Sequence, residues 1–363
     1  MSQDFIPAAK PIIGTGERAA VDAVLASGML AQGSEVAAFE REFAEVLLDG
    51  RASVAVNSGT SGLHLGLLAC GVGSGDEVIV PSFTFAATGN AVALTGATPV
   101  FADIELDYYS LDVGHVESLI TENTKGIMPV HLYGHPFAAE AFAALADKHG
   151  IDLYEDAAQA HGAALNGRRV GTFGRFAMFS LYPTKNMTSG EGGMVSTSEP
   201  SVERRLRLLR NQGMDKQYEN EMVGFNNRMT DLHAAIGRVQ LTNVMGWTRQ
   251  RQDNAAFLTA NLEGVGTPKV AQGASHVYHQ YTIRVPAGRD EMHTRLRSEF
   301  NIGTGVYYPV PNHRLPSFNR SEDLPNTEVA VREVLSLPVH PSLSQNDLER
   351  IVTAVNTIVK AGA

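Results

Sequence analysis

Residues 152–159, with the sequence DLYEDAAQ, and residues 177–186, with the sequence AMFSLYPTKN, each run from a largely apolar segment into polar residues. Each apolar segment is typical of a buried strand. Asp156 stands at the end of the first predicted strand, and Lys185 follows the second after a short turn. Because the carboxyl ends of parallel strands converge on one crevice, we expect both side chains to reach the same ligand.

Predicted strands and helices alternate over about 150 residues around these two stretches. A helix between successive strands makes the crossover that a parallel pair requires. The alternation therefore predicts an α/β fold with a mainly parallel, mixed sheet covered by helices, which residues 192–197 are expected to close. The strands are expected at 53–56, 77–80, 99–104, 126–130, 152–155 and 177–181, and the helices at 61–70, 85–94, 113–120 and 138–149.

The pattern changes from about residue 247, where short strands and longer helices predict a small C-terminal α+β domain. Ser344 is a plausible N-cap for the last of these helices. We expect three parts: an N-terminal segment (1–30) packed on the small domain, a large domain (31–246) and the small domain (247–363). Further helices are expected at 16–27, 34–48, 201–211, 230–244, 290–300 and 344–359, and further strands at 281–285 and 305–308.

Composition favours a cytoplasmic enzyme. The 363 residues are 44% hydrophobic and 19% charged, which is ordinary for a folded protein. A net charge of -10 argues against a nucleic-acid binder, and no run of 18 apolar residues predicts a membrane span. The single cysteine, Cys70, cannot form an internal disulfide, and the first residues lack the pattern of a signal peptide.

The predicted pair of Asp156 and Lys185 has the chemistry that pyridoxal 5'-phosphate (PLP) requires. A lysine forms the imine and moves protons, while a carboxylate keeps the pyridine nitrogen protonated so that the ring accepts electrons. The alternative is that Asp156 caps a helix and Lys185 is a solvated loop lysine. No metal is expected, because the 12 histidines show no metal-ligand spacing.

Residues 57–62, with the sequence NSGTSG, follow a predicted strand and open a helix. Free backbone N–H groups, the helix dipole and the hydroxyls of Thr60 and Ser61 would suit a phosphate group. Ordinary helix capping would explain the same residues. No Gly-Lys-Ser/Thr sequence follows, so the segment is not a P-loop.

In combination these motifs resemble the DegT/StrS family of PLP-dependent nucleotide-sugar aminotransferases, which has the aspartate aminotransferase-like fold called fold type I. The resemblance extends from Pro11 to about Pro341. It is carried by residues 57–65 (NSGTSGLHL), 75–85 (GDEVIVPSFTF), 155–162 (EDAAQAHG), 182–186 (YPTKN), 190–194 (GEGGM) and 224–229 (GFNNRM).

The resemblance implies a role for each matching residue. Lys185 would carry the cofactor, Asp156 would bind its pyridine nitrogen, and Gln159 would lie against its ring or phenolic oxygen. Phe85 would stack on the ring, where other members have Trp or Tyr. The phosphate would be held by Gly59, Thr60 and Ser180 and by Asn226 of a neighbouring subunit, which implies a homodimer with shared active sites.

Residues 305–313, with the sequence GVYYPVPNH, resemble the small-domain segment that closes over the sugar. Tyr307, Tyr308 and His313 are the candidate substrate contacts, although members often have His at the position of Tyr307. The segment is similar to that of enzymes acting on 3-keto sugars. Residues 225–229 mix patterns of the 3-keto and 4-keto subgroups, so the keto position stays open.

The resemblance implies transfer of an amino group from an amino acid, glutamate or glutamine, to a keto-sugar nucleotide. Related sugar dehydratases carry His where this chain has Lys185, so lysine favours amino transfer. Two alternatives remain: a cyclitol aminotransferase that accepts a keto-inositol without a nucleotide, and a PLP-binding regulatory protein without turnover.

Overall fold

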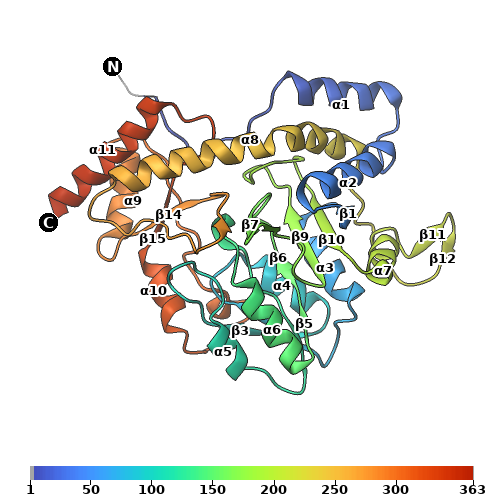
Figure 1. Ribbon diagram of the computed structural model, residues 1–363. Coiled ribbons are helices and arrows are strands. Elements are labelled where there is room, and N and C mark those ends of the chain that lie inside the picture. Colours follow the sequence, from blue (N-terminus) through green and yellow to red (C-terminus); the bar gives the residue numbers. More distant parts are fainter. Residues whose placement is uncertain (1–3, 363) are drawn as a thin grey trace.

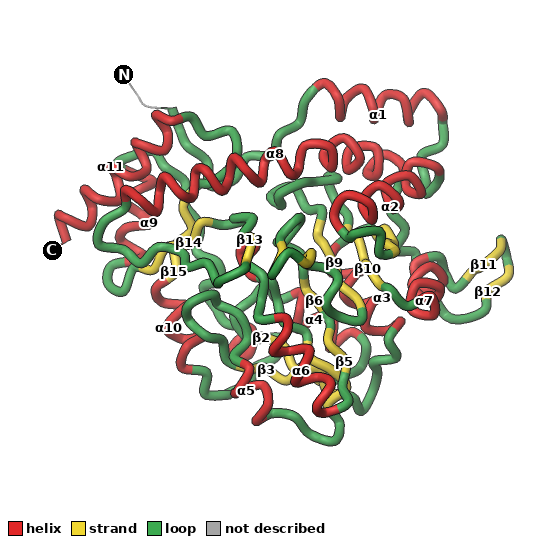
Figure 2. Tube along the Cα trace, in the orientation of Figure 1, coloured by secondary structure: helices red, strands yellow, loops and turns green. Residues whose placement is uncertain are grey.

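The computed structural model describes residues 4–362 and has a central sheet enclosed by helices (Figures 1 and 2). The sheet has two hydrogen-bonded parts, in the orders β3-β2-β4-β5 and β6-β9-β10-β1. Its strands are β1 (Ala52–Val56), β2 (Glu77–Pro81), β3 (Thr98–Ala102), β4 (Thr124–Ile127), β5 (Asp152–Leu153), β6 (Glu155–Asp156), β9 (Phe176–Ser180) and β10 (Gly193–Thr197).

The two parts of the sheet join through β5 and β6, which Tyr154 separates. Hydrogen bonding continues across this break, because the backbone N–H of Tyr154 donates to Ile127 (2.9 Å) and that of Asp156 donates to Pro129 (3.1 Å). Strand β10 is antiparallel to both of its neighbours, while the pairings of β2, β3, β4 and β5, and of β6 with β9, are parallel. The expected mainly parallel, mixed sheet is confirmed.

Alternate residues of the strands face two different apolar cores, which is why both faces of the sheet are covered. In β9, Met178 belongs to a core with helix α3 (Gly59–Ala69), whereas Phe179 belongs to a core with helix α2 (Ser34–Leu47). The remaining helices of this region are α4 (Ala87–Leu94), α5 (Val113–Ser118), α6 (Ala139–His149) and α7 (Pro200–Arg210).

Helix α8 (Asp231–Asn261) connects the two ends of the molecule and is the long gold helix of Figure 1. Helices α1 (Thr15–Ser27) and α2 pack against it. Its Leu241 lies in the core of the sheet region, and its Leu258 lies in the core of the C-terminal region. The predicted domain division at residue 246 therefore falls inside one continuous helix.

The C-terminal region pairs β14 (Tyr281–Arg284) with β15 (Val334–Leu337) beside α9 (Arg289–Ser298), α10 (Pro325–Glu333) and α11 (Gln345–Gly362). Ser344 caps α11, since its Oγ accepts from the backbone N–H of Asp347 (3.2 Å). Ile6 lies in the same core and bridges to Ile302. The short elements elsewhere are β7 (Ala164–Leu165), β8 (Arg168–Arg169), β11 (Met214–Lys216), β12 (Glu219–Asn220), β13 (Ala274–Ser275) and two 3-10 turns (Leu132–Gly134, Asn312–Arg314).

One expected strand is wrong. In residues 305–308 only Gly305 forms a bridge, to Ser336, and the next residues leave the strand direction. Tyr307 and Tyr308 instead turn toward a cavity at the edge of the central sheet.

No helix within residues 4–362 combines the length and the apolarity that crossing a bilayer requires.

Candidate functional site

A cavity of about 360 Å³ lies where the carboxyl ends of β6 and β9 meet the N-terminus of α3. Convergence of parallel strand ends at one edge explains why side chains distant in sequence gather there. The structure brings together nine of the residues singled out from the sequence, namely Gly59, Thr60, Phe85, Asp156, Gln159, Ser180, Lys185, Tyr307 and Tyr308.

Asp156 is a fixed, buried carboxylate at the end of β6, with 4% of its surface exposed. Its Oδ2 accepts from the hydroxyl of Thr88 (2.8 Å), and its Oδ1 accepts from the backbone N–H of Ala158 (3.1 Å). Burial raises the pKa of this carboxyl, while both hydrogen bonds and the nearby Lys185 oppose the rise. A cationic ligand group in the cavity would favour the ionised carboxylate further.

Lys185 is half-buried, and a hydrogen bond fixes its backbone but not its side chain. Its N–H donates to Tyr182 (3.0 Å) in the turn after β9. Its Nζ makes no hydrogen bond or ion pair with any residue in the part of the chain that the structure describes. Burial lowers the pKa of Lys185 to about 8, against the opposing effect of Asp156. The lowered pKa leaves more of this amine neutral near neutral pH than an ordinary lysine would have, and the neutral form is a nucleophile and a proton acceptor.

The N-terminus of α3 forms one wall of the cavity. Ser58 caps the helix by accepting from the N–H of Ser61 (3.1 Å), and the first helical residues, Gly59 and Thr60, line the cavity. A Cβ at Gly59 would lie 3.2 Å from the Oγ of Ser180, so glycine allows the helix to begin against β9. The helix start, Thr60 and Ser180 together provide donors and a positive dipole end for a phosphate.

Gln159 links the 3-10 turn at Leu132–Gly134 to the segment that follows α9. Its Oε1 accepts from the backbone N–H of Tyr133 (2.6 Å), and its Nε2 donates to the hydroxyl of Tyr308 (3.2 Å). The hydroxyl of Tyr133 donates to the carbonyl of Tyr307. Phe85 stands at the mouth, 58% exposed, with its ring centroid 5.9 Å from that of Tyr308.

Two predicted site residues lie outside the lining of this cavity. Asn226 is exposed on the loop before α8, where it bridges to Asn211. His313 is fully buried, and its Nδ1 lies 2.6 Å from the hydroxyl of Ser82 at the end of β2. This geometry gives no support to substrate contact by His313, whose predicted role remains untested.

Sequence reasoning missed several residues of the site, of which Thr88 and His279 are the most informative. Thr88 is fully buried on α4, and no motif signals that its hydroxyl reaches Asp156. His279 lines the cavity, and its Nδ1 lies 3.3 Å from the Oδ1 of Asn186, next to Lys185 in sequence.

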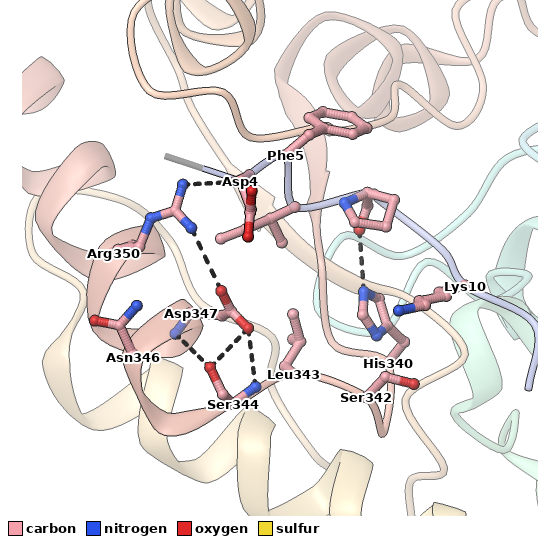
Figure 3. A pocket seen from close by; sticks show the side chains of 12 residues that line it. Asp4, Phe5, Lys10, His340, Ser342, Leu343, Ser344, Asn346, Asp347 and Arg350 are labelled. Carbon is pink, nitrogen blue, oxygen red and sulfur yellow. Dashed lines mark hydrogen bonds and ion pairs between the residues drawn. The ribbon is translucent and has the colours of Figure 1, made fainter. Parts of the chain in front are cut away.

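A larger hollow, of about 460 Å³, lies between the N-terminal segment and the start of α11 (Figure 3). Several of its polar groups contact one another or the backbone. Arg350 pairs with Asp347, which also accepts from Ser344, and His340 lies 3.1 Å from the carbonyl of Pro7. The lysine and the two aspartates that line this hollow, Lys10, Asp4 and Asp347, are exposed or half-buried, whereas Asp156 is buried. The site at the sheet edge is therefore the better candidate for catalysis.

A sequence model of the DegT/DnrJ/EryC1/StrS aminotransferase family matches residues 11–356. The chain belongs to this family. It is 43% identical over 345 residues to the dTDP-3-amino-3,4,6-trideoxy-alpha-D-glucose transaminase of Streptomyces venezuelae, covering 93% of this chain and 90% of that protein. The match fits a site whose lysine and aspartate meet in one cavity.

Two solved structures share the fold over nearly the whole chain. The structure of S. venezuelae DesV in complex with a ketimine intermediate has a TM-score of 0.91 and 41% identity, covering 95% of each chain. The PLP form of the putative sugar aminotransferase Spr1654 from Streptococcus pneumoniae has a TM-score of 0.93 and 26% identity, covering 99% of this chain and 100% of that chain. The predicted fold type I architecture is thus confirmed.

Proposed function

We propose that this family member is a PLP-dependent aminotransferase that moves an amino group from L-glutamate to a keto-sugar nucleotide, giving an amino sugar. One observation carries the proposal: a lysine amine without a partner in residues 4–362 and a buried, fixed carboxylate share one cavity with the N-terminus of a helix.

The residues present fit PLP. The start of α3, Thr60 and Ser180 would hold the phosphate, Asp156 would meet the pyridine nitrogen, and Phe85 would cover the ring. When bound, PLP supplies an electron sink for the carbon that loses or gains the amino group. The start of α3, whose first residues Gly59 and Thr60 line the cavity, suits a phosphate-sized anion at this end.

The chain's own residues then divide the work. Asp156, oriented by Thr88, holds a proton on the pyridine nitrogen. Lys185 would accept a proton at Nζ and return it to the carbon next to the transferred nitrogen. Its pKa of about 8 allows both steps near neutral pH. Tyr307 and Tyr308 close the cavity from the side of the C-terminal region and would exclude water around the sugar.

For the sugar, we favour a nucleotide-linked 3-keto substrate. The supporting observation is the name of the S. venezuelae relative, a dTDP-3-amino sugar transaminase with 43% identity.

We also propose that the enzyme is a cytoplasmic homodimer in which Asn226 of one subunit completes the phosphate site of the other. The exposed position of Asn226 outside its own cavity supports this arrangement.

The test combines the spectrum of the purified protein with an assay of amino transfer. The protein should be yellow, with a band that borohydride reduction removes while labelling Lys185. Incubation with glutamate and a dTDP-linked 3-keto sugar should yield the amino sugar, seen by mass spectrometry, and the 4-keto isomer should react more slowly. Lys185→Ala is the control and should give no product.

The outcomes separate the alternatives. Faster reaction of a free keto-inositol than of any nucleotide sugar would assign the chain to cyclitol amination. Borohydride labelling without amino transfer to any keto sugar would indicate a PLP-binding regulatory protein. A colourless protein after incubation with excess PLP would overturn the proposed cofactor.

A further inference from the structure

A second, much smaller cavity also touches Lys185. It measures about 20 Å³ and lies between the turn after β9, the segment before α1 and the C-terminal half of α8. A space on the order of 10–15 Å³ or more holds one water-sized particle. The cavity therefore has room for a single water or a single monatomic ion, and is too small for a carboxylate or a phosphate.

Arg251, on α8, lines this cavity as a buried cation that forms no ion pair with any residue in the described part of the chain. It is 7% exposed, its guanidinium donates to the carbonyl of Tyr278 (3.2 Å), and its Nε has no partner within residues 4–362. Burial alone lowers the pKa of Arg251 to about 10, with no neighbouring charge contributing. The other deeply buried arginine, Arg210, differs because it pairs directly with the carboxylate of Glu40.

The remaining lining reinforces the positive character of this cavity. Lys185 and Lys10 are both among the lining residues, and none of the described residues that line it is acidic. Trp247, one helical turn before Arg251, lines it too, and its indole N–H makes no hydrogen bond to a described residue. Burying an uncompensated charge is costly unless a partner of opposite charge is present.

We propose that this cavity is a binding site for one halide ion, chloride under physiological conditions, held by the guanidinium of Arg251. A water molecule could accept a hydrogen bond from Arg251, but it would leave the buried charge of Arg251 uncompensated. A monatomic anion fits the volume available, accepts the hydrogen bond and compensates the charge. It also favours the protonated form of Lys185 whenever the lysine amine is free.

The site does not depend on the proposed amino transfer, because it involves Arg251 and an inorganic ion rather than a substrate. The primary test is a crystal of the PLP-loaded wild-type protein, prepared with sodium bromide in place of chloride. Bromide scatters anomalously, so an ion in this cavity should give an anomalous difference peak within hydrogen-bonding distance of the guanidinium of Arg251.

Two variants supply the matched comparison in solution. Arg251→Met removes the guanidinium, whereas Arg249→Met removes the same charge from an exposed position two residues earlier on α8. At equal ionic strength, chloride or bromide should raise the Tm above its value in sodium gluconate, on the order of a few degrees, for the wild type and Arg249→Met. Arg251→Met should lose this halide-specific difference.

The wild-type crystal decides the question even if Arg251→Met fails to fold. The proposal would be overturned if the cavity held only a water, if a side chain of a partner subunit contacted Arg251, or if no anomalous peak appeared. Equal Tm values in halide and gluconate for the wild type would also count against it. A bromide peak without any halide effect on Tm would show binding at crystal concentration only and would overturn a physiological chloride site.

Discussion

At the scale of single residues, the two groups that meet in the large cavity are held in opposite ways. Asp156 is buried and oriented by Thr88 and Ala158, so its carboxylate has one available direction. Lys185 is anchored only through its backbone, and its amine has no partner among the described residues. This arrangement suits a site in which the carboxylate keeps a ligand group protonated and the unpartnered amine accepts and donates a proton during the reaction.

Lys185 should give the reaction with PLP a distinctive pH dependence. Burial lowers its pKa to about 8, and only the neutral amine attacks an aldehyde. Attachment of PLP to the cofactor-free protein should therefore accelerate as the pH rises, reach half its maximum near pH 8, and level off above. Stopped-flow absorbance measures the rate. A midpoint near that of an ordinary lysine, about 10.4, would show that burial does not tune this amine.

Thr88 should act as a positioning residue for Asp156. Thr88→Val keeps the shape of the side chain but removes the hydroxyl that donates to Oδ2. Loss of a hydrogen bond to a charged group costs roughly 1.5–3 kcal/mol, so kcat should fall about 10–100-fold. The pH at which the absorbance of the bound cofactor changes should shift as well.

Thr88→Ser restores the hydroxyl and should restore both kcat and the spectral titration. A purely structural role would instead lower the Tm of Thr88→Val while leaving the spectral titration where it is in the wild type.

At the scale of elements, close packing places the phosphate-binding end of α3. Gly62 and Gly66, one turn apart, face the sheet, where a Cβ at Gly62 would lie 2.7 Å from Met178 and one at Gly66 would lie 2.4 Å from the Phe176 ring. Both sheet residues are buried and cannot move aside without disturbing the core. The two glycines thus set the distance of α3 from β9, and with it the position of Gly59.

Gly66→Ala should push α3 away from the sheet. Overpacking of this kind costs about 1–3 kcal/mol, so a lower Tm is expected together with weaker retention of PLP during dialysis. Gly73→Ala is the matched control, because a Cβ there meets nothing within 4 Å. Equal PLP retention in both variants would show that α3 does not position the phosphate site.

The sequence predicted these elements best where the pattern is local. The strand ends at Asp156 and the turn to Lys185 follow from alternation and from a recognisable motif, and the structure brings both residues into one cavity. Helix α8 is longer than the expected 230–244, because Ala255 and Leu258 are buried in a second core that local periodicity does not reveal. Thr88 escaped prediction because its contact with Asp156 spans 68 residues.

At the scale of the whole molecule, we infer from exposed apolar side chains that another subunit covers the mouth of the cavity. Phe85 and Tyr182 are 58% and 48% exposed there, and Phe225 is 37% exposed beside Asn226. Large exposed apolar side chains gathered near a site commonly mark a protein interface. The β11–β12 hairpin projects from the body of the molecule in the same part of the chain (Figure 1).

A mixing experiment tests whether Asn226 completes the site of a neighbouring subunit. Lys185→Ala and Asn226→Ala should each have low activity as purified proteins, and Asn226→Ala should retain PLP weakly. In a hybrid dimer, the Lys185→Ala subunit donates its intact Asn226, and the Asn226→Ala subunit keeps its intact Lys185. One site then has both residues and the other has neither, so activity should reappear on mixing and reach about half that of the wild type per hybrid if sites act independently. Hybrids verified by two affinity tags that remain inactive would place Asn226 in its own subunit's site, or in none.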